Sequence, residues 1–212
     1  MDKKYRLTEE TINVNGRTLH RIEAIKDFSD VKKGEKGGYV ENEGNLSQYG
    51  DCWAYDNAKI YGDAEVYDNV SIFDNAEVYG YAVVSGDARV YDNANVFGRA
   101  LVFDNAEVCG YAVVCGSAIV YDNAQVYGYA EVYDNAQVYD KAKIHGNTKI
   151  YGKAKVYHDA IVCDNAQVYG NAVVRGYAIV RGYAKVYGDA VVHGDAQLCG
   201  DTEVCGNVRV CD

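Results

Sequence analysis

The unit A-E-V-Y-D-N at residues 64–69 recurs in varied form, for example as A-Q-V-Y-G-Y at residues 124–129, without one inserted or missing residue from Leu46 onward. Counted from Cys52, position 1 is Ala in 22 of 27 units, position 2 is mostly polar, and position 3 is Val, Ile or Leu in all units but one. This alternation is typical of a short strand with one buried face. Positions 5 and 6 are mostly Gly, Asp or Asn, which tolerate the positive φ of a corner. Each unit therefore predicts a strand of about four residues and a corner.

One unit cannot bury its Ala/Val face alone, so the units are expected to stack into a solenoid. The aliphatic exceptions at position 2 indicate the length of one coil. Five of these eight residues are separated by multiples of 18, whereas a 12-residue period divides the eight evenly between two faces. We therefore predict a triangular parallel β-helix with about nine 18-residue coils, about 43 Å long at ~4.8 Å per coil.

Residues 1–45 do not follow the repeat and are predicted to cap the β-helix of residues 46–212. Asn15-Gly16, at the centre of residues 11–19, is a strong signal for a type I′ hairpin, and residues 31–38 form a turn region rich in Lys and Gly. A cap covers the backbone groups and the core that a terminal coil leaves open.

The last coil keeps the core register at Val204, Val208 and Val210, with nothing after it in the sequence. We therefore expect a second copy of the chain to cover this end.

The tandem pattern A-x-V-x-x-x resembles the hexapeptide repeat of the LpxA-like superfamily, whose members are left-handed parallel β-helices. Four N-terminal stretches resemble the YdcK-like branch of bacteria and their prophages. They are K-Y-R-L (4–7), D-F-S-D-V-K (27–32), G-G-Y-V (37–40) and N-L-S-Q-Y-G-D-C-W (45–53). The resemblance implies an all-β, single-stranded, left-handed β-helix and a nominal transferase activity, although this chain is shorter and more regular than that branch.

Composition limits the classes of function. The 212 residues are 49% hydrophobic and 25% charged, as in folded soluble proteins, and no apolar run is long enough to span a membrane. The N-terminus has no secretory signal, so the chain is expected to be cytoplasmic and its seven cysteines reduced. A formal net charge of −10 disfavours binding to nucleic acid, which requires clustered Lys and Arg.

Aromatic residues recur at position 4 and are expected to form stacked ladders on the outer surface. These rings could bind the flat faces of bases or sugars. The favoured interpretation is that they stack on each other and stabilise the rod, which leaves no free face for a ligand. The ladder predicted on one face of the prism consists of Tyr61, Tyr79, Phe97, Tyr133, Tyr151, Tyr169 and Tyr187.

The aliphatic residues at position 2 of another face predict a self-association surface. That face also carries Ser85, Phe103 and Tyr121, and it is interrupted at Gln137 and Lys155. Related β-helices assemble as trimers with parallel axes, so this face predicts a trimer, whereas the open last coil predicts a tail-to-tail dimer. The alternative for the face is that surface valines follow β-propensity alone. The aliphatic residues are Val83, Leu101, Ile119, Val173 and Val191.

Resemblance to acyltransferases implies a His general base near a subunit interface. His193 is the best candidate, with Arg175 one coil away on the same ladder, and His145 is a second. The unbroken register leaves no inserted loop or helical region to build a pocket, and no phosphate-binding loop is present. No metal site is expected either, because cysteines six residues apart, such as Cys109 and Cys115, fall on successive faces.

These observations favour a non-catalytic structural or binding solenoid without cofactors. It would present tyrosine ladders and an apolar self-association face to itself or to a protein or small-molecule partner, in a phage or prophage setting by resemblance. The alternative is a trimeric, CoA-dependent acyltransferase with an interfacial His as general base.

Overall fold

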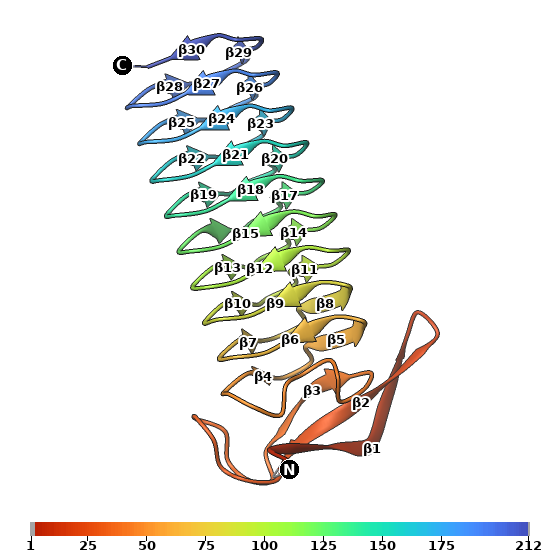
Figure 1. The fold of residues 1–212 in the computed structure, drawn as a ribbon. Coiled ribbons are helices and arrows are strands. Elements are labelled where there is room, and N and C mark those ends of the chain that lie inside the picture. The colour runs from red at the N-terminus through yellow and green to blue at the C-terminus, as the bar shows by residue number, and fades with distance from the viewer. Residues whose placement is uncertain (1–2, 212) are drawn as a thin grey trace.

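The computed structural model describes residues 3–211. Coils stack on one another along a rod, and an antiparallel hairpin lies at the N-terminal end (Figure 1). The hairpin consists of β1 (Tyr5–Val14) and β2 (Arg17–Ala24), and β3 (Lys36–Val40) follows it. Three sheets run the length of the rod, one on each side of the triangular coil, as the sequence predicts.

Sheet 1 continues from β3, and sheets 2 and 3 contain nine strands each. After β3, sheet 1 contains β5 (Lys59–Gly62), β8 (Glu77–Gly80), β11 (Asn95–Val96), β14 (Val113–Val114), β17 (Glu131–Val132), β20 (Lys149–Ile150), β23 (Gln167–Val168), β26 (Lys185–Val186) and β29 (Glu203–Val204). Sheet 2 contains β4 (Trp53–Ala54), β7 (Ser71–Ile72), β10 (Arg89–Val90), β13 (Glu107–Val108), β16 (Gln125–Val126), β19 (Lys143–Ile144), β22 (Ile161–Val162), β25 (Ile179–Val180) and β28 (Gln197–Leu198). Sheet 3 contains β6 (Glu65–Val66), β9 (Val83–Val84), β12 (Leu101–Val102), β15 (Ile119–Val120), β18 (Gln137–Val138), β21 (Lys155–Val156), β24 (Val173–Val174), β27 (Val191–Val192) and β30 (Arg209–Val210).

Each residue pairs with the residues 18 positions before and after it. Leu101, for example, pairs with Val83 on one side and with Ile119 on the other, so the predicted 18-residue coil is confirmed. Most strands contain two residues instead of the predicted four, because the flanking residues already belong to corners. The hydrogen-bond ladder nevertheless continues past the strand ends, since the Phe103 N–H donates to the Val120 carbonyl oxygen at 3.1 Å.

The core is a narrow column of small aliphatic side chains. Ala124 and Val126 have no exposed area, and the other repeats bury positions 1 and 3 in the same way up to the last coils. Trp53 occupies the outward position 2 of the first coil, yet it is also fully buried. Its ring lies 6.0 Å from that of Tyr5 and 5.4 Å from that of Phe28. The cap therefore covers one side of the first coil as well as its end.

Position 5 of each unit turns the corner with a left-handed backbone. Gly98 has φ of 74°, and a Cβ there would lie 2.9 Å from the backbone nitrogen of Gly116 in the next coil. Asp134 has φ of 59°, and its carboxylate accepts a hydrogen bond from the Gly152 N–H one coil on, at 3.1 Å. Asp therefore tolerates the conformation and also satisfies a corner N–H of the following coil.

The cap is built as the sequence predicts in its hairpin and differently in the segment that follows. Asn15 and Gly16, with φ of 52° and 82°, turn the chain between β1 and β2. Residues 36–38, predicted as part of a turn region, belong to β3, which pairs antiparallel with β2 and parallel with β5. Gly37 is needed here for close approach, because a Cβ would lie 2.5 Å from the Ala54 carbonyl oxygen.

Burial declines in the last coil. Val204 is 6% exposed, Val210 is partly buried, and Val208 is 51% exposed. Within residues 3–211 no helix has the length and apolar character needed to cross a membrane.

Candidate functional site

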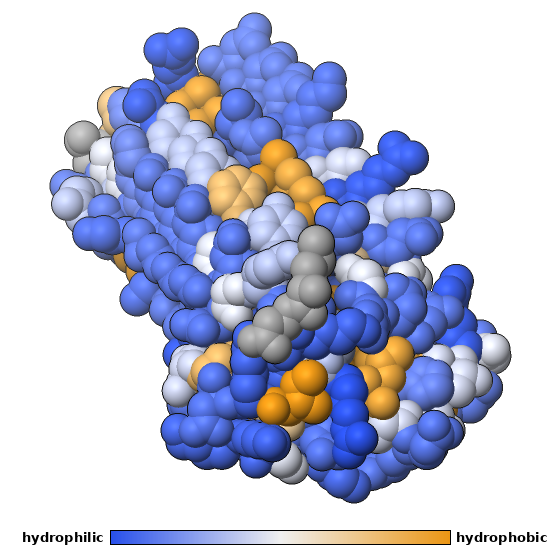
Figure 2. Space-filling view, turned by 60° about the horizontal axis from the view of Figure 1, so that its bottom comes forward, coloured by the Kyte–Doolittle hydropathy of each residue, from blue (hydrophilic) through white to orange (hydrophobic). Residues whose placement is uncertain are grey.

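The outer face of sheet 3 carries the predicted association residues, which we call the apolar strip: Val83, Leu101, Ile119, Val173 and Val191. The first three lie in register on adjacent strands, as do the last two. All five side chains are partly exposed, and Gln137 and Lys155 separate the two groups. The face of the molecule drawn in Figure 2 is mostly blue, with small orange groups that are separated from one another. The structure therefore brings the predicted residues onto one face.

Charged residues at position 2 are paired on sheet 1 and unpaired on sheet 3. All six in the repeats of sheet 1 form ion pairs between adjacent coils. These pairs are Lys59–Glu77 at 2.7 Å, Glu131–Lys149 at 3.1 Å and Lys185–Glu203 at 2.9 Å. On sheet 3, Glu65, Lys155 and Arg209 have no ion pair within residues 3–211, because their neighbours in adjacent coils are uncharged. Sheet 3 therefore combines an apolar surface with charges that no ion pair neutralises within residues 3–211.

The predicted aromatic ladder lies on sheet 1, and its rings stack on each other. Neighbouring ring centroids are 4.8–4.9 Å apart, and the planes are within 6° of parallel. Cys115 divides the ladder, so that Phe97 and Tyr133 end separate stacks. The Tyr61 hydroxyl donates to the Glu77 carboxylate at 2.9 Å. Because both faces of an inner ring are covered, this ladder offers mainly edges and hydroxyls to a ligand.

A second ladder runs beside the apolar strip on sheet 3. Phe103, Tyr121, Tyr139 and Tyr157 stack with centroids 4.7–5.0 Å apart. Burial raises the pKa of Tyr139 to about 12, so its hydroxyl stays protonated at neutral pH. Sequence analysis placed the first two rings on this face and did not select Tyr139 and Tyr157, although the same 18-residue spacing identifies them. These two rings continue the apolar surface past the interruption in the strip.

The histidines proposed as a general base lie on different faces. His193 and Arg175 are one coil apart on sheet 3, two residues after Val191 and Val173 of the apolar strip. His145 lies on sheet 2, where its ring stacks on that of Tyr127 at 4.8 Å. The structure thus keeps His193 beside the strip and does not bring His145 to it.

Protonation of His145 is expected to destabilise the fold. Burial lowers its pKa from the ordinary value of 6.5, so the unfolded chain binds this proton more tightly. The free energy of unfolding should therefore fall as pH drops below about 6.5. A His145→Tyr variant should lose less stability than the parent chain between pH 7.5 and 5.5 in urea titrations. If both proteins lost the same free energy of unfolding over this pH range, the lowered pKa of His145 would be contradicted.

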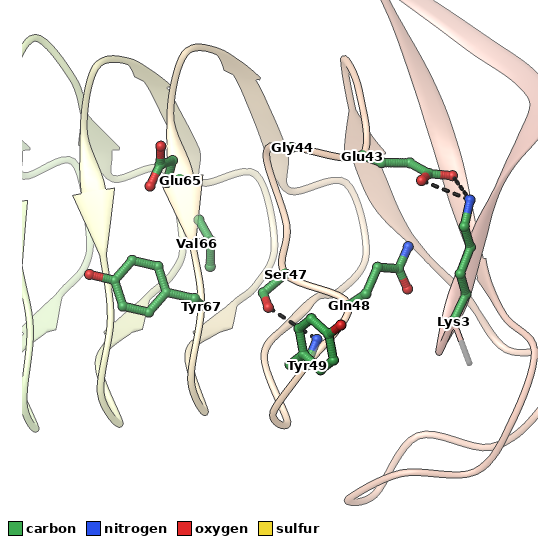
Figure 3. A pocket seen from close by; sticks show the side chains of 9 residues that line it. All are labelled: Lys3, Glu43, Gly44, Ser47, Gln48, Tyr49, Glu65, Val66 and Tyr67. Carbon is green, nitrogen blue, oxygen red and sulfur yellow. Dashed lines mark hydrogen bonds and ion pairs between the residues drawn. The ribbon is translucent and has the colours of Figure 1, made fainter. Parts of the chain in front are cut away.

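A pocket of about 450 Å³ lies between the cap and the first strand of sheet 3 (Figure 3). Glu65 and Tyr67 line one side, and the other side is lined by residues of the cap, such as Glu43, and by residues 47–49 that follow it. The Lys3 ammonium is already held by Glu43 at 2.6 Å, and Gln48 accepts a hydrogen bond from the Lys4 N–H at 3.0 Å. The pocket opens at the end of the face that carries the apolar strip.

A second, shallower hollow of about 290 Å³ lies at the corner between sheets 3 and 2. It is lined by Asp122, Asp140 and His158, and His158 Nε2 lies 3.8 Å from the Asp140 carboxylate. Among residues 3–211 no three His, Cys, Asp or Glu side chains converge as metal ligands. Asp122, Asp140 and His158 thus occupy the same corner position in three successive coils.

Lys4 and Cys52 form a buried polar contact that sequence analysis missed. Lys4 is 1% exposed, and its ammonium donates to the carbonyl oxygens of Gly50 at 3.0 Å and Cys52 at 2.8 Å. Burial lowers the pKa of Lys4 and raises the pKa of the Cys52 thiol, whose sulfur lies 3.3 Å from Lys4 Nζ. The contact fastens the N-terminal segment to the first coil. No pattern signals it, because lysine is rarely buried.

Comparison with known proteins agrees with the fold. The family model described as the YdcK β-solenoid repeat matches residues 166–182. A curated protein of Escherichia coli K12, named "Uncharacterized acetyltransferase YdcK", is 41% identical over 66 residues. That match covers 27% of this chain and 20% of the relative, so the chain corresponds to only a small part of that protein. The repeat match, the partial identity and the coiled architecture together make this chain similar to the YdcK-like β-solenoid repeat proteins.

Proposed function

We propose that this chain is a non-catalytic structural or binding solenoid that self-associates through the outer face of sheet 3. The main observation that supports this proposal is the contrast between two faces of the same rod. Sheet 1 neutralises all the charged residues at position 2 of its repeats within the chain, whereas sheet 3 presents the apolar strip and unpaired Glu65, Lys155 and Arg209. Covering a face of this composition with a complementary surface lowers the free energy, because apolar area is removed from water.

The stacked rings fit the same role. Phe103, Tyr121, Tyr139 and Tyr157 already contact their neighbours along the rod, so they lose little side-chain freedom when a second surface covers their edges. A rigid face of aromatic and aliphatic side chains is the usual centre of a protein–protein interface.

Thiol labelling tests which face is covered in solution. Leu101→Cys places a thiol on sheet 3, and Val113→Cys places one at the equivalent position of sheet 1. Labelling of Cys at 101 should slow as the protein concentration rises, whereas labelling at 113 should not change; mass spectrometry of peptides separates these sites from the native cysteines. Concentration-independent labelling at both sites would refute self-association through sheet 3.

An acyltransferase is the second candidate, because His193 lies beside the apolar strip with Arg175 one coil away. Self-association through sheet 3 would place both side chains at an interface, where a second copy could complete a site. The relative's name includes "acetyltransferase". Titration calorimetry with acetyl-CoA distinguishes the two candidates: saturable binding would favour the enzyme, and no heat of binding would favour the scaffold.

A further inference from the structure

The charges and apolar residues of sheet 3 are arranged almost symmetrically about its middle strand, β18. Unpaired Glu65 lies on the first strand of the sheet and unpaired Arg209 on the last. The two groups of the apolar strip lie between these ends, on either side of Gln137. Reversing the direction of the rod therefore places apolar groups opposite apolar groups and the acidic end opposite a basic end.

We propose that two copies pair sheet 3 against sheet 3 with their rods antiparallel, related by a two-fold axis that passes beside Gln137. This inference rests on the proposed self-association and adds its orientation and register. Along position 2, one register matches both the charges and the apolar groups. Its pairs are Glu65 with the partner's Arg209, Val83 with the partner's Val191, Leu101 with the partner's Val173, Ile119 with the partner's Lys155, and Gln137 with the partner's Gln137.

The residues at position 4 agree with this register. A two-fold axis along the strand direction keeps position 4 opposite position 4, so Phe103 meets the partner's Arg175 and Tyr121 meets the partner's Tyr157. Arg over an aromatic ring is a favourable cation–π contact. The methylene stem of Lys155 can cover Ile119 while its ammonium reaches the aromatic edges beside it.

Parallel association does not satisfy the charges of this face. With parallel rods, Lys155, Arg175 and Arg209 of both copies lie in one half of the interface, and both Glu65 side chains lie at the opposite end. Like charges placed together in a partly desolvated interface oppose association. Antiparallel rods instead bring each Glu65 to a basic end, and an isologous contact of this kind closes after two copies.

In this arrangement a side chain of the partner lies at the pocket beside the cap. It is lined by Glu65 and Tyr67 and opens at the end of sheet 3, where the partner's Arg209 would lie. The hairpin continues sheet 1 (Figure 1), whereas residues 45–47 hydrogen-bond along the first strand of sheet 3. The partner's last coil would therefore lie against the first coil and cap of the other copy.

Site-directed disulfides distinguish the orientations. Cys211 is the one native cysteine on the outer face of sheet 3 within residues 3–211, so Cys211→Ser provides the background. We would mix a Val83→Cys chain with a Val191→Cys chain under mild oxidation. Positions 83 and 191 are six coils apart, about 29 Å at ~4.8 Å per coil, which is far beyond disulfide reach within one chain or between parallel rods.

The antiparallel register predicts a mixed 83–191 disulfide and no 83–83 or 191–191 disulfide. A self-associated protein that forms an 83–83 or 191–191 link, or no mixed link, would overturn the orientation and leave the proposed function standing. A chain that is monomeric at all concentrations would overturn the proposed function itself.

A charge exchange tests the same register without cysteines. Glu65→Arg alone and Arg209→Glu alone should each raise the dissociation constant of the dimer about tenfold, because two like-charge contacts form per dimer. The chain with both changes should recover most of the original affinity. A double variant as weak as the single variants would contradict the pairing of Glu65 with the partner's Arg209.

Discussion

A chain carrying Leu101→Lys and Ile119→Lys is expected to be a 23 kDa monomer at concentrations at which the intact chain self-associates. Both side chains belong to the first apolar group of sheet 3 and pair with each other on adjacent strands. Two ammonium groups in a covered apolar face cost several kcal/mol, enough to raise a dissociation constant by at least a hundredfold. Light scattering coupled to size-exclusion chromatography measures the mass directly.

Equivalent charges on other faces supply the control. Val113→Lys on sheet 1 and Ile161→Lys on sheet 2 place lysines at the same position of the repeat, on partly exposed aliphatic residues. These variants should keep the mass of the intact chain, and circular dichroism should show that all variants keep their strands. Dissociation caused equally by lysines on all three faces would contradict a specific role for sheet 3.

Ala124→Leu is expected to lower the free energy of unfolding by about 3 kcal/mol, at the upper end of the usual cost of overpacking a core. Ala124 has no exposed area, and the residues one coil before and after it, Ala106 and Ala142, are equally buried. The layers lie only ~4.8 Å apart, so a larger side chain displaces several coils at once. Urea unfolding followed by circular dichroism measures the difference.

Gln125→Leu is the matched control because it adds an apolar side chain one residue later, on the outer face of sheet 2. Its expected effect is within about 0.5 kcal/mol. If Ala124→Leu were as stable as Gln125→Leu, the column would have space that the packing described above excludes.

Local rules explain how much of the rod could be predicted. The coil length followed from a few aliphatic residues at a polar position, such as Leu101 and Ile119, because residues in register on one sheet share a face. The corners followed from the conformational freedom of Gly and Asp, as at Gly98 and Asp134. Each of these features depends on one unit and on its neighbours 18 residues away.

The cap was harder to predict because its structure depends on contacts between distant segments. The glycines of residues 36–38 indicated a turn, yet Gly37 serves close approach to Ala54 within a strand. Lysine side chains are ordinarily exposed, and position 2 of the repeat, which Trp53 occupies, ordinarily faces solvent. Lys4 and Trp53 are buried because the N-terminal segment packs against the first coil. No periodicity marks such a contact, so it requires the three-dimensional structure.

The candidate site also has features that the repeat spacing predicts and features that only the structure shows. The position of the apolar strip on one face was predictable from spacing, and the neighbouring rings Tyr139 and Tyr157 were equally accessible to that argument. The contrast in ion pairing between sheets 1 and 3 follows from the same spacing, because each ion pair joins residues 18 positions apart; only the distances between the charged atoms required the structure. That contrast favours sheet 3 over sheet 1 as the association surface.

The most direct test of self-association is the absolute mass of the intact chain over a dilution series from about 100 μM to below 1 μM, which corresponds to dissociation free energies of about 5.5 to 8 kcal/mol. The proposed pairing predicts a mass near twice 23.3 kDa at the high end and a fall toward 23.3 kDa on dilution. A constant mass of 23.3 kDa at every concentration would contradict it.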